Sequence, residues 1–102
     1  MTNHKSIVLI TGANKGIGFE VAKQLKHADR HILVGARDQQ RGEEATRQLV
    51  ELGVSASFLP IDITDDASIE NASAMVSSDF GQLDVLINNA CLLYTSDAAD
   101  ES

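Results

Sequence analysis

Residues 7–18 read Ile-Val-Leu-Ile-Thr-Gly-Ala-Asn-Lys-Gly-Ile-Gly, an apolar run that leads directly into a turn with three glycines. Four consecutive apolar residues between polar neighbours are typical of a parallel strand that is covered on both faces. After the glycines, Val21, Leu25 and Ala28 recur at the spacing of one helical face, opposite a polar and charged face. The segment therefore predicts a strand, a tight turn and a helix, in that order.

The same unit repeats along the chain. Further apolar runs lie at residues 31–36, 57–63 and 83–87, with Pro60 expected near the end of its strand, and the helical patterns between these runs end at Gly53 and Gly81. Strands that alternate with helices of this length form right-handed crossovers, which give a parallel sheet with helices on both faces. We therefore expect an α/β fold, a partial Rossmann fold with a doubly wound parallel sheet of four strands.

The last helical pattern begins after two candidate N-caps, Thr64 and Asp65. Five apolar residues of this helix share one face, and the helical period predicts that this face is buried; they are Ile69, Ala72, Met75, Val76 and Phe80.

Composition limits the class of protein and its partners. The 102 residues are 43% apolar and 23% charged, which is typical of a globular domain, and the net charge is -7. An acidic chain lacks the clustered Lys and Arg that bind nucleic acid or an anionic membrane, so we expect neither as a partner. The single cysteine, Cys91, permits no intrachain disulfide, and residues 1–6 do not form a signal sequence. A cytoplasmic location follows as an expectation.

The glycine-rich turn has the composition of a phosphate-binding loop. Gly12 permits a tight turn, Gly16 lets the backbone approach a pyrophosphate, and Gly18 permits close helix packing, while the helix N-terminus offers free N–H groups to an anion. An ordinary glycine-rich loop is the alternative interpretation. The spacing differs from the G-x-G-x-x-G of the general dinucleotide fingerprint, and no G-K-[ST] follows as in a P-loop.

Two motifs resemble the short-chain dehydrogenases/reductases. Residues 11–18 are similar to the T-G-x-x-x-G-x-G motif of that family, and residues 83–90, Leu-Asp-Val-Leu-Ile-Asn-Asn-Ala, resemble its fourth strand with the N-N-A-G sequence. The residues of the first motif, together with Gly-Ala-Arg-Asp at residues 35–38, are most similar to those of carbonyl reductase-like members. The resemblance covers nearly all of residues 6–90 and implies a nicotinamide dinucleotide as ligand.

The resemblance also implies site residues. Asp62 and Ile63 would flank the adenine ring, and Asn89 and Ala90 would lie beside a ribose of the cofactor. The alternatives are a helix N-cap for Asp62 and a hydrogen bond between strands for Asn88. With the glycine turn and the arginine discussed next, the expected cofactor-binding residues are Gly12, Asn14, Lys15, Gly16, Ile17, Gly18, Arg37, Asp62, Ile63, Asn89 and Ala90. No metal site is expected.

The end of the second strand indicates which nicotinamide cofactor binds. NAD-binding proteins of this architecture place an acidic residue there to accept from the ribose 2′-hydroxyl. This chain has Ala36 followed by Arg37, whose guanidinium can donate two parallel hydrogen bonds to a 2′-phosphate, and Lys15 can add a second charge. We therefore expect NADP(H). The competing residue is Asp38, which could take the 2′-hydroxyl if the strand ended later.

The catalytic residues of the family cannot be identified in this chain. Its members use a Tyr whose pKa is lowered by a Lys four residues later, and the only tyrosine here, Tyr94, is followed at that distance by Ala98. We expect an NADP(H)-binding fragment of an oxidoreductase, inactive alone, whose parent would act on a small carbonyl or alcohol. A catalytically inactive NADP-sensing module is the alternative. A methyltransferase of related fold would lack the Asn-Asn-Ala element.

The resemblance stops after Ala90. Residues 91–101 look like the in-frame translation of an adapter used in preparing sequencing libraries, and a natural truncation with an acidic tail is the alternative. We therefore expect residues 1–90 to form the NADP-binding part of a Rossmann domain and residues 91–102 to form an irregular, non-native or disordered tail.

Overall fold

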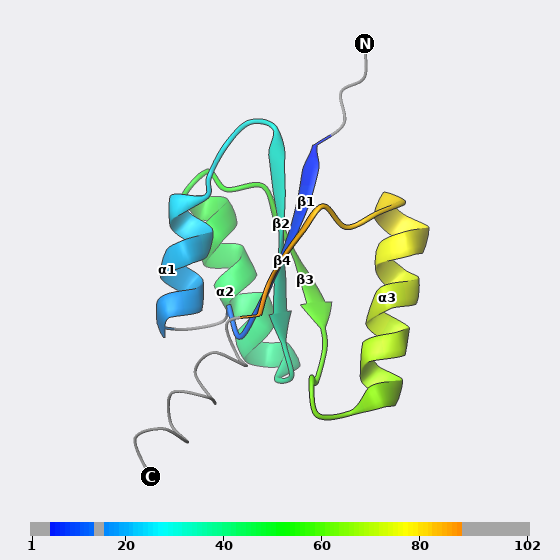
Figure 1. Cartoon of the computed structure of the whole chain (residues 1–102). Coiled ribbons are helices and arrows are strands. Elements are labelled where there is room, and N and C mark those ends of the chain that lie inside the picture. The colour runs from blue at the N-terminus through cyan, green and yellow to red at the C-terminus, as the bar shows by residue number, and fades with distance from the viewer. Residues whose placement is uncertain (1–4, 14–15, 89–102) are drawn as a thin grey trace, which may run out of the picture.

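The computed structural model describes residues 5–13 and 16–88. These residues form four strands and three helices in alternation (Figure 1). In chain order the elements are β1 (Ser6–Thr11), α1 (Gly16–Gln24), β2 (Arg30–Ala36), α2 (Gln39–Glu51), β3 (Ala56–Pro60), α3 (Asp66–Phe80) and β4 (Val85–Ile87). The strands are all parallel, in the order β3-β2-β1-β4.

The sheet separates two apolar layers. Helices α1 and α2 cover one face and α3 covers the other (Figure 1). Alternate residues of each strand point to opposite faces, so Val8 and Ile10 of β1 pack beneath α1 and α2, while Ile7 and Leu9 pack on the side of α3. The expected doubly wound parallel sheet of the α/β class is therefore confirmed.

Strand β4 is the outermost strand on one side of the described sheet. It pairs with β1 over three residues, Val85 to Ile87, whereas β1 pairs with β2 over six. The Asp84 carboxylate extends this pairing, because its Oδ2 accepts from the Ile7 amide at 2.8 Å while the Asp84 amide donates to the Ile7 carbonyl at 2.9 Å. Val85 and Leu86 remain 45% and 56% exposed, one on each face of the strand.

Two predicted element boundaries were wrong. Helix α1 ends at Gln24 rather than near Ala28, where the Lys26 amide donates to the Lys23 carbonyl at 3.2 Å in a tighter turn. The Arg30 guanidinium donates to the Leu25 carbonyl at 3.1 Å and gives the end of the helix a partner. Strand β3 ends at Pro60 rather than at Ile63. The Ile61 amide still donates to the Ala36 carbonyl at 3.0 Å, and because β2 ends at Ala36 there is no further strand to pair with.

Of the two candidate N-caps of α3, Asp65 is confirmed, because its side chain accepts from the Ala67 amide at 3.0 Å.

The buried face of α3 is narrower than its period predicts. Ala72 and Val76 are buried, whereas Ile69 and Met75 are 38% and 40% exposed. The amphipathic pattern was therefore right about the face and wrong about how much of it the described residues cover. The predicted tail, residues 91–102, lies outside the described residues.

Candidate functional site

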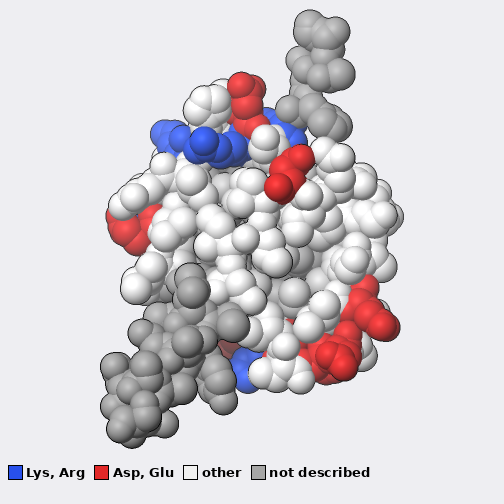
Figure 2. Space-filling model, in the orientation of Figure 1, with Lys and Arg blue, Asp and Glu red and all other residues white. Residues whose placement is uncertain are grey.

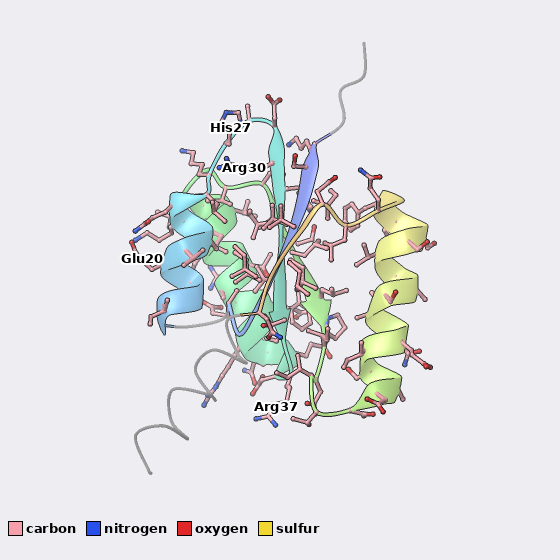
Figure 3. The ribbon with its side chains drawn as sticks, viewed as in Figure 1. Glu20, His27, Arg30 and Arg37 are labelled. Atoms are coloured by element: carbon pink, nitrogen blue, oxygen red, sulfur yellow. The ribbon has the colours of Figure 1, made fainter. Side chains whose placement is uncertain are left out.

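All four strands end at the same edge of the sheet, and this edge is where the predicted residues gather. Strand β1 is followed by a connection to one neighbour, β2, while β4 lies on its other side, so the strand order reverses at β1. In open parallel sheets, ligands bind at such a reversal, outside the carboxyl ends of the strands. Arg37 lies at this end of the molecule, and the labelled His27 and Arg30 lie at the opposite end (Figure 3).

The glycine turn is anchored to β2. The Gly35 carbonyl accepts from the amides of Gly12, at 2.7 Å, and Ala13, at 3.3 Å. Gly12 has a φ of 69° and Gly16 a φ of 64°, a left-handed conformation that other L-residues rarely adopt. The anchor fixes the position of the turn relative to the sheet.

The start of α1 faces the edge without a competing acid. The first turn of α1 contains no acidic residue, so nothing in it repels an anion from the free N–H groups of the helix. A Cβ built on Gly16 meets no protein atom within 4 Å, so the space beside it is open. Gly18 is buried, as expected of close helix packing, and Ile17 is 61% exposed at the edge.

A hydrogen bond links the ends of β1 and β4. The Thr11 hydroxyl donates to Asn88 Oδ1 at 2.9 Å, and Thr11 is almost completely buried. The strand-to-strand role considered for Asn88 is therefore confirmed. This bond fixes the position of Asn88, the first residue of the Asn-Asn-Ala element. Asn89 and Ala90, like Asn14 and Lys15, lie outside the described residues, so their predicted roles stay predictions.

Arg37 and Asp38 have different environments although they are neighbours. Strand β2 ends at Ala36, and Asp38 is the N-cap of α2, with Oδ1 accepting from the Arg41 amide at 3.0 Å and Oδ2 3.9 Å from Arg41 Nε. Arg37 is exposed and belongs to none of the ion pairs among the described residues. The carboxylate is thus engaged in capping, while the guanidinium is available at the edge.

Asp62 and Ile63 follow β3 at the same edge. The Asp62 carboxylate accepts from the Thr64 hydroxyl at 2.6 Å and from the Thr64 amide at 3.0 Å, and the Asp62 amide donates to Ser68 Oγ at 2.8 Å. The hydrogen bonds from the Thr64 side chain and backbone lower the pKa of Asp62, and the charge of Arg37 lowers it further. Asp62 is therefore an ionised turn residue and not the cap of α3.

A groove of about 550 Å³ runs beside the edge, between α3 and the face of the sheet that α3 covers. Thr11, Ile63 and Asn88 line one end of it and Gly81 and Leu83 the other, with apolar side chains between. Figure 2 shows that the surface in view is mostly free of charged groups at its centre. The groove joins the candidate site to the exposed face of Leu86.

The structure thus brings Gly12, Gly16, Arg37, Asp62 and Ile63 to one edge of the sheet. The sequence interpretation missed the Gly35 carbonyl as the anchor of the turn. A signal was available, because a glycine inside a strand often marks a close approach of backbone; a Cβ on Gly35 would lie 3.0 Å from Leu9 and 3.1 Å from the Ile10 carbonyl.

Two exclusions apply to the described residues. They contain no group of three His, Cys, Asp or Glu side chains that could hold a metal ion. No helix among them is long and apolar enough to cross a membrane.

Comparison with known proteins agrees with this geometry. Residues 6–102 match the family model described as short chain dehydrogenase. The chain is 42% identical to (-)-isopiperitenone reductase of Mentha piperita over 94 residues, which are 88% of this chain and 30% of the relative. It is 38% identical to carbonyl reductase [NADPH] 1 of Sus scrofa over 98 residues, 95% of this chain and 34% of the relative.

Solved structures give the same result. An actinorhodin polyketide ketoreductase variant with NADPH superposes with a TM-score of 0.78 at 33% identity, over 85% of this chain and 33% of that protein. Menthone neomenthol reductase from Mentha piperita gives 0.76 at 37% identity, over 82% of this chain and 31% of that protein. The chain therefore spans about a third of the length of the proteins it matches.

Proposed function

Because this chain belongs to the short-chain dehydrogenase family, we propose that it forms the NADP(H)-binding part of an oxidoreductase that acts on a small carbonyl or alcohol. The observation that carries the proposal is the glycine turn, anchored by Gly35 and opening onto the N-terminus of α1, with Arg37 at the same edge. A helix N-terminus and a guanidinium are both suited to the phosphates of a dinucleotide.

The choice of NADP(H) over NAD(H) rests on Arg37 and Asp38. A guanidinium without an ion pair among the described residues can bind the 2′-phosphate, whereas the Asp38 carboxylate is held by the Arg41 amide. Lys15 is proposed as the second cation. Two relatives support this choice by name, since the pig carbonyl reductase is designated for NADPH and the ketoreductase structure contains it.

The residues of this chain would bind and orient the cofactor. The amides of the turn and of the first turn of α1 would hold the pyrophosphate, and Asp62 and Ile63 would flank the adenine. Asn89 and Ala90 would lie beside a ribose. Bound NADPH supplies the hydride; the proton donor is proposed to come from a part of the whole protein that this third of it does not contain.

A binding titration tests the proposal. NADPH and NADH fluorescence is followed as the 102-residue chain is added, and NADPH should bind at least about tenfold more tightly, the effect of one additional charge-assisted contact. Equal affinities would overturn the cofactor choice, and no binding of either would overturn the site. A longer protein that contains this segment but no Tyr-x-x-x-Lys would favour the alternative of an NADP-sensing module.

A further inference from the structure

A polar network lies at the end of the sheet opposite the cofactor edge. His31, the second residue of β2, is half-buried, and both of its ring nitrogens have partners on β3 or just before it. Nδ1 lies 2.7 Å from Ser55 Oγ and Nε2 lies 2.9 Å from Ser57 Oγ. Lys5, which precedes β1, donates from Nζ to the same Ser55 Oγ at 3.2 Å. Three neighbouring segments of the sheet thus meet at one imidazole.

The network also holds the end of α3. The rings of His31 and Phe80, the last residue of α3, have centroids 5.3 Å apart at an interplanar angle of 33°. At the other end of the helix, Ser68 Oγ accepts from the Asp62 amide at 2.8 Å. Between these two points only the small side chains of Ala72 and Val76 are buried. The contact between His31 and Phe80 is therefore one attachment of the last turn of α3, beside the packing of Phe80 and Val76 on the apolar residues beneath the helix.

Of the groups around His31, the Lys5 ammonium disfavours the charged form of the ring. Strand β3 offers hydroxyl groups, α3 offers a phenyl ring, and the segment before β1 offers the Lys5 ammonium. Among the described residues, no carboxylate forms a hydrogen bond or an ion pair with this imidazole. Burial lowers the pKa of His31 below its ordinary value, and the charge of Lys5 lowers it further.

We propose that the His31 network is an acid-sensitive latch that loosens the last turn of α3 when the imidazole gains a proton. In the neutral ring one nitrogen accepts a hydrogen bond from a serine hydroxyl and the other donates one. The protonated ring only donates, so Ser55 Oγ must accept from two cations, His31 and Lys5. The added charge is also partly buried, which removes part of its hydration.

The direction of the pH effect follows from linkage. The unfolded chain has the ordinary histidine pKa of 6.5, and the folded chain has a lower one. The contribution of neutral His31 to stability is therefore complete above pH 6.5 and is lost as the pH falls from 6.5 through the folded pKa. Each unit between the two pKa values corresponds to about a tenfold rise in the unfolding equilibrium constant.

Urea unfolding of the 102-residue chain, followed by circular dichroism between about pH 7.5 and 5, tests the proposal. The unfolding midpoint should fall with pH in the unsubstituted chain, and His31→Gln, which keeps a hydrogen-bonding side chain without the charge, should abolish most of that fall. Lys5→Gln should reduce it. His27→Gln is the matched control, because His27 makes none of these contacts, and it should leave the fall in place.

Nuclear magnetic resonance then locates the effect. The His31 ring should titrate below 6.5, and over the same range the Gly81 amide, which donates to the Val76 and Ser77 carbonyls at 3.1 Å, should lose protection from exchange. The Leu52 amide at the end of α2 should keep its protection. A ring that titrates at or above 6.5, an equal loss at Leu52, or the same pH profile in His31→Gln as in the unsubstituted chain would each overturn the proposal.

Discussion

Replacing Arg37 with alanine should convert the chain from a binder that prefers NADPH to one that treats both cofactors alike. Arg37 follows β2 directly and carries an exposed guanidinium with no ion pair among the described residues. The substitution therefore removes the proposed contact with the 2′-phosphate and disrupts no salt bridge of the described structure.

The magnitude follows from the exposure of the side chain. A hydrogen bond to a charged group contributes about 1.5–3 kcal/mol, and an exposed pair lies toward the lower end because solvent screens it. We therefore expect a loss of about 1.5–2 kcal/mol, or roughly 10- to 30-fold in the NADPH dissociation constant. NADH lacks the 2′-phosphate, so its affinity should change little.

The assay is a fluorescence titration with each cofactor at low and high salt. Arg47→Ala is the matched control, because it removes the same side chain and charge from α2, where Arg47 pairs with Glu44 and Glu51. Higher salt should weaken NADPH binding in the unsubstituted chain and in the control more than in Arg37→Ala. Equal losses for NADPH and NADH, or an equal effect of Arg47→Ala, would refute the assignment of Arg37.

Three substitutions of the scaffold and the site have separate expected outcomes. Gly16→Ala places a Cβ at a φ of 64° where it meets no protein atom, so it should cost about 1–2 kcal/mol in unfolding free energy. The same Cβ should obstruct the pyrophosphate and reduce NADPH affinity by more than that free energy; unchanged binding would contradict the pyrophosphate role. Gly42→Ala places a Cβ 2.1 Å from Phe58 Cε1, and this overpacking of about 1–3 kcal/mol should outweigh the gain of about 1 kcal/mol in helix propensity, as urea unfolding can measure. Phe58→Leu in the same chain should make the alanine neutral or favourable, and failure of that rescue would refute the steric explanation. Thr11→Val removes the donor to Asn88 Oδ1 and should cost about 1 kcal/mol in thermal unfolding, with weaker NADPH binding; equal stability would show that this bond is unimportant.

The gathering of the candidate residues at one edge of the sheet could be predicted from the sequence because its signals are local. The glycine turn lies between an apolar run and a helical period, and Arg37 directly follows a strand, so each position depends on a few neighbouring residues. Because the strands pair in parallel, their carboxyl ends lie at the same edge of the sheet, and no knowledge of tertiary contacts is needed to predict this. The role of Asp38 could not be fixed in this way, because it depended on whether β2 ended one residue earlier or later.

The His31 network could not be predicted, because nothing in the sequence relates its members. Lys5, His31, Ser55 and Phe80 belong to four segments of the chain, and no spacing connects them. The same is true of the bond from the Arg30 guanidinium to the Leu25 carbonyl at the end of α1, which no capping residue in the sequence indicates. Periodicity likewise identified the apolar face of α3 but could not tell that Ile69 and Met75 would stay partly exposed.

The two proposed sites lie at opposite ends of β2, because His31 is its second residue and Arg37 follows its last residue. His31 and Arg37 are six residues apart, which at about 3.3 Å per residue corresponds to roughly 20 Å along a strand. Sites at that distance with no shared partner act additively. Both sites nevertheless adjoin α3. The Phe80 ring of α3 lies against His31, and the Asp62 amide at the other end donates to Ser68 of α3. Acid release of the last turn of α3 should therefore reach the adenine side only if the whole helix moves as a unit. The hydrogen bond between the Asp62 amide and Ser68 opposes that movement, because it holds the first turn of α3 independently of His31.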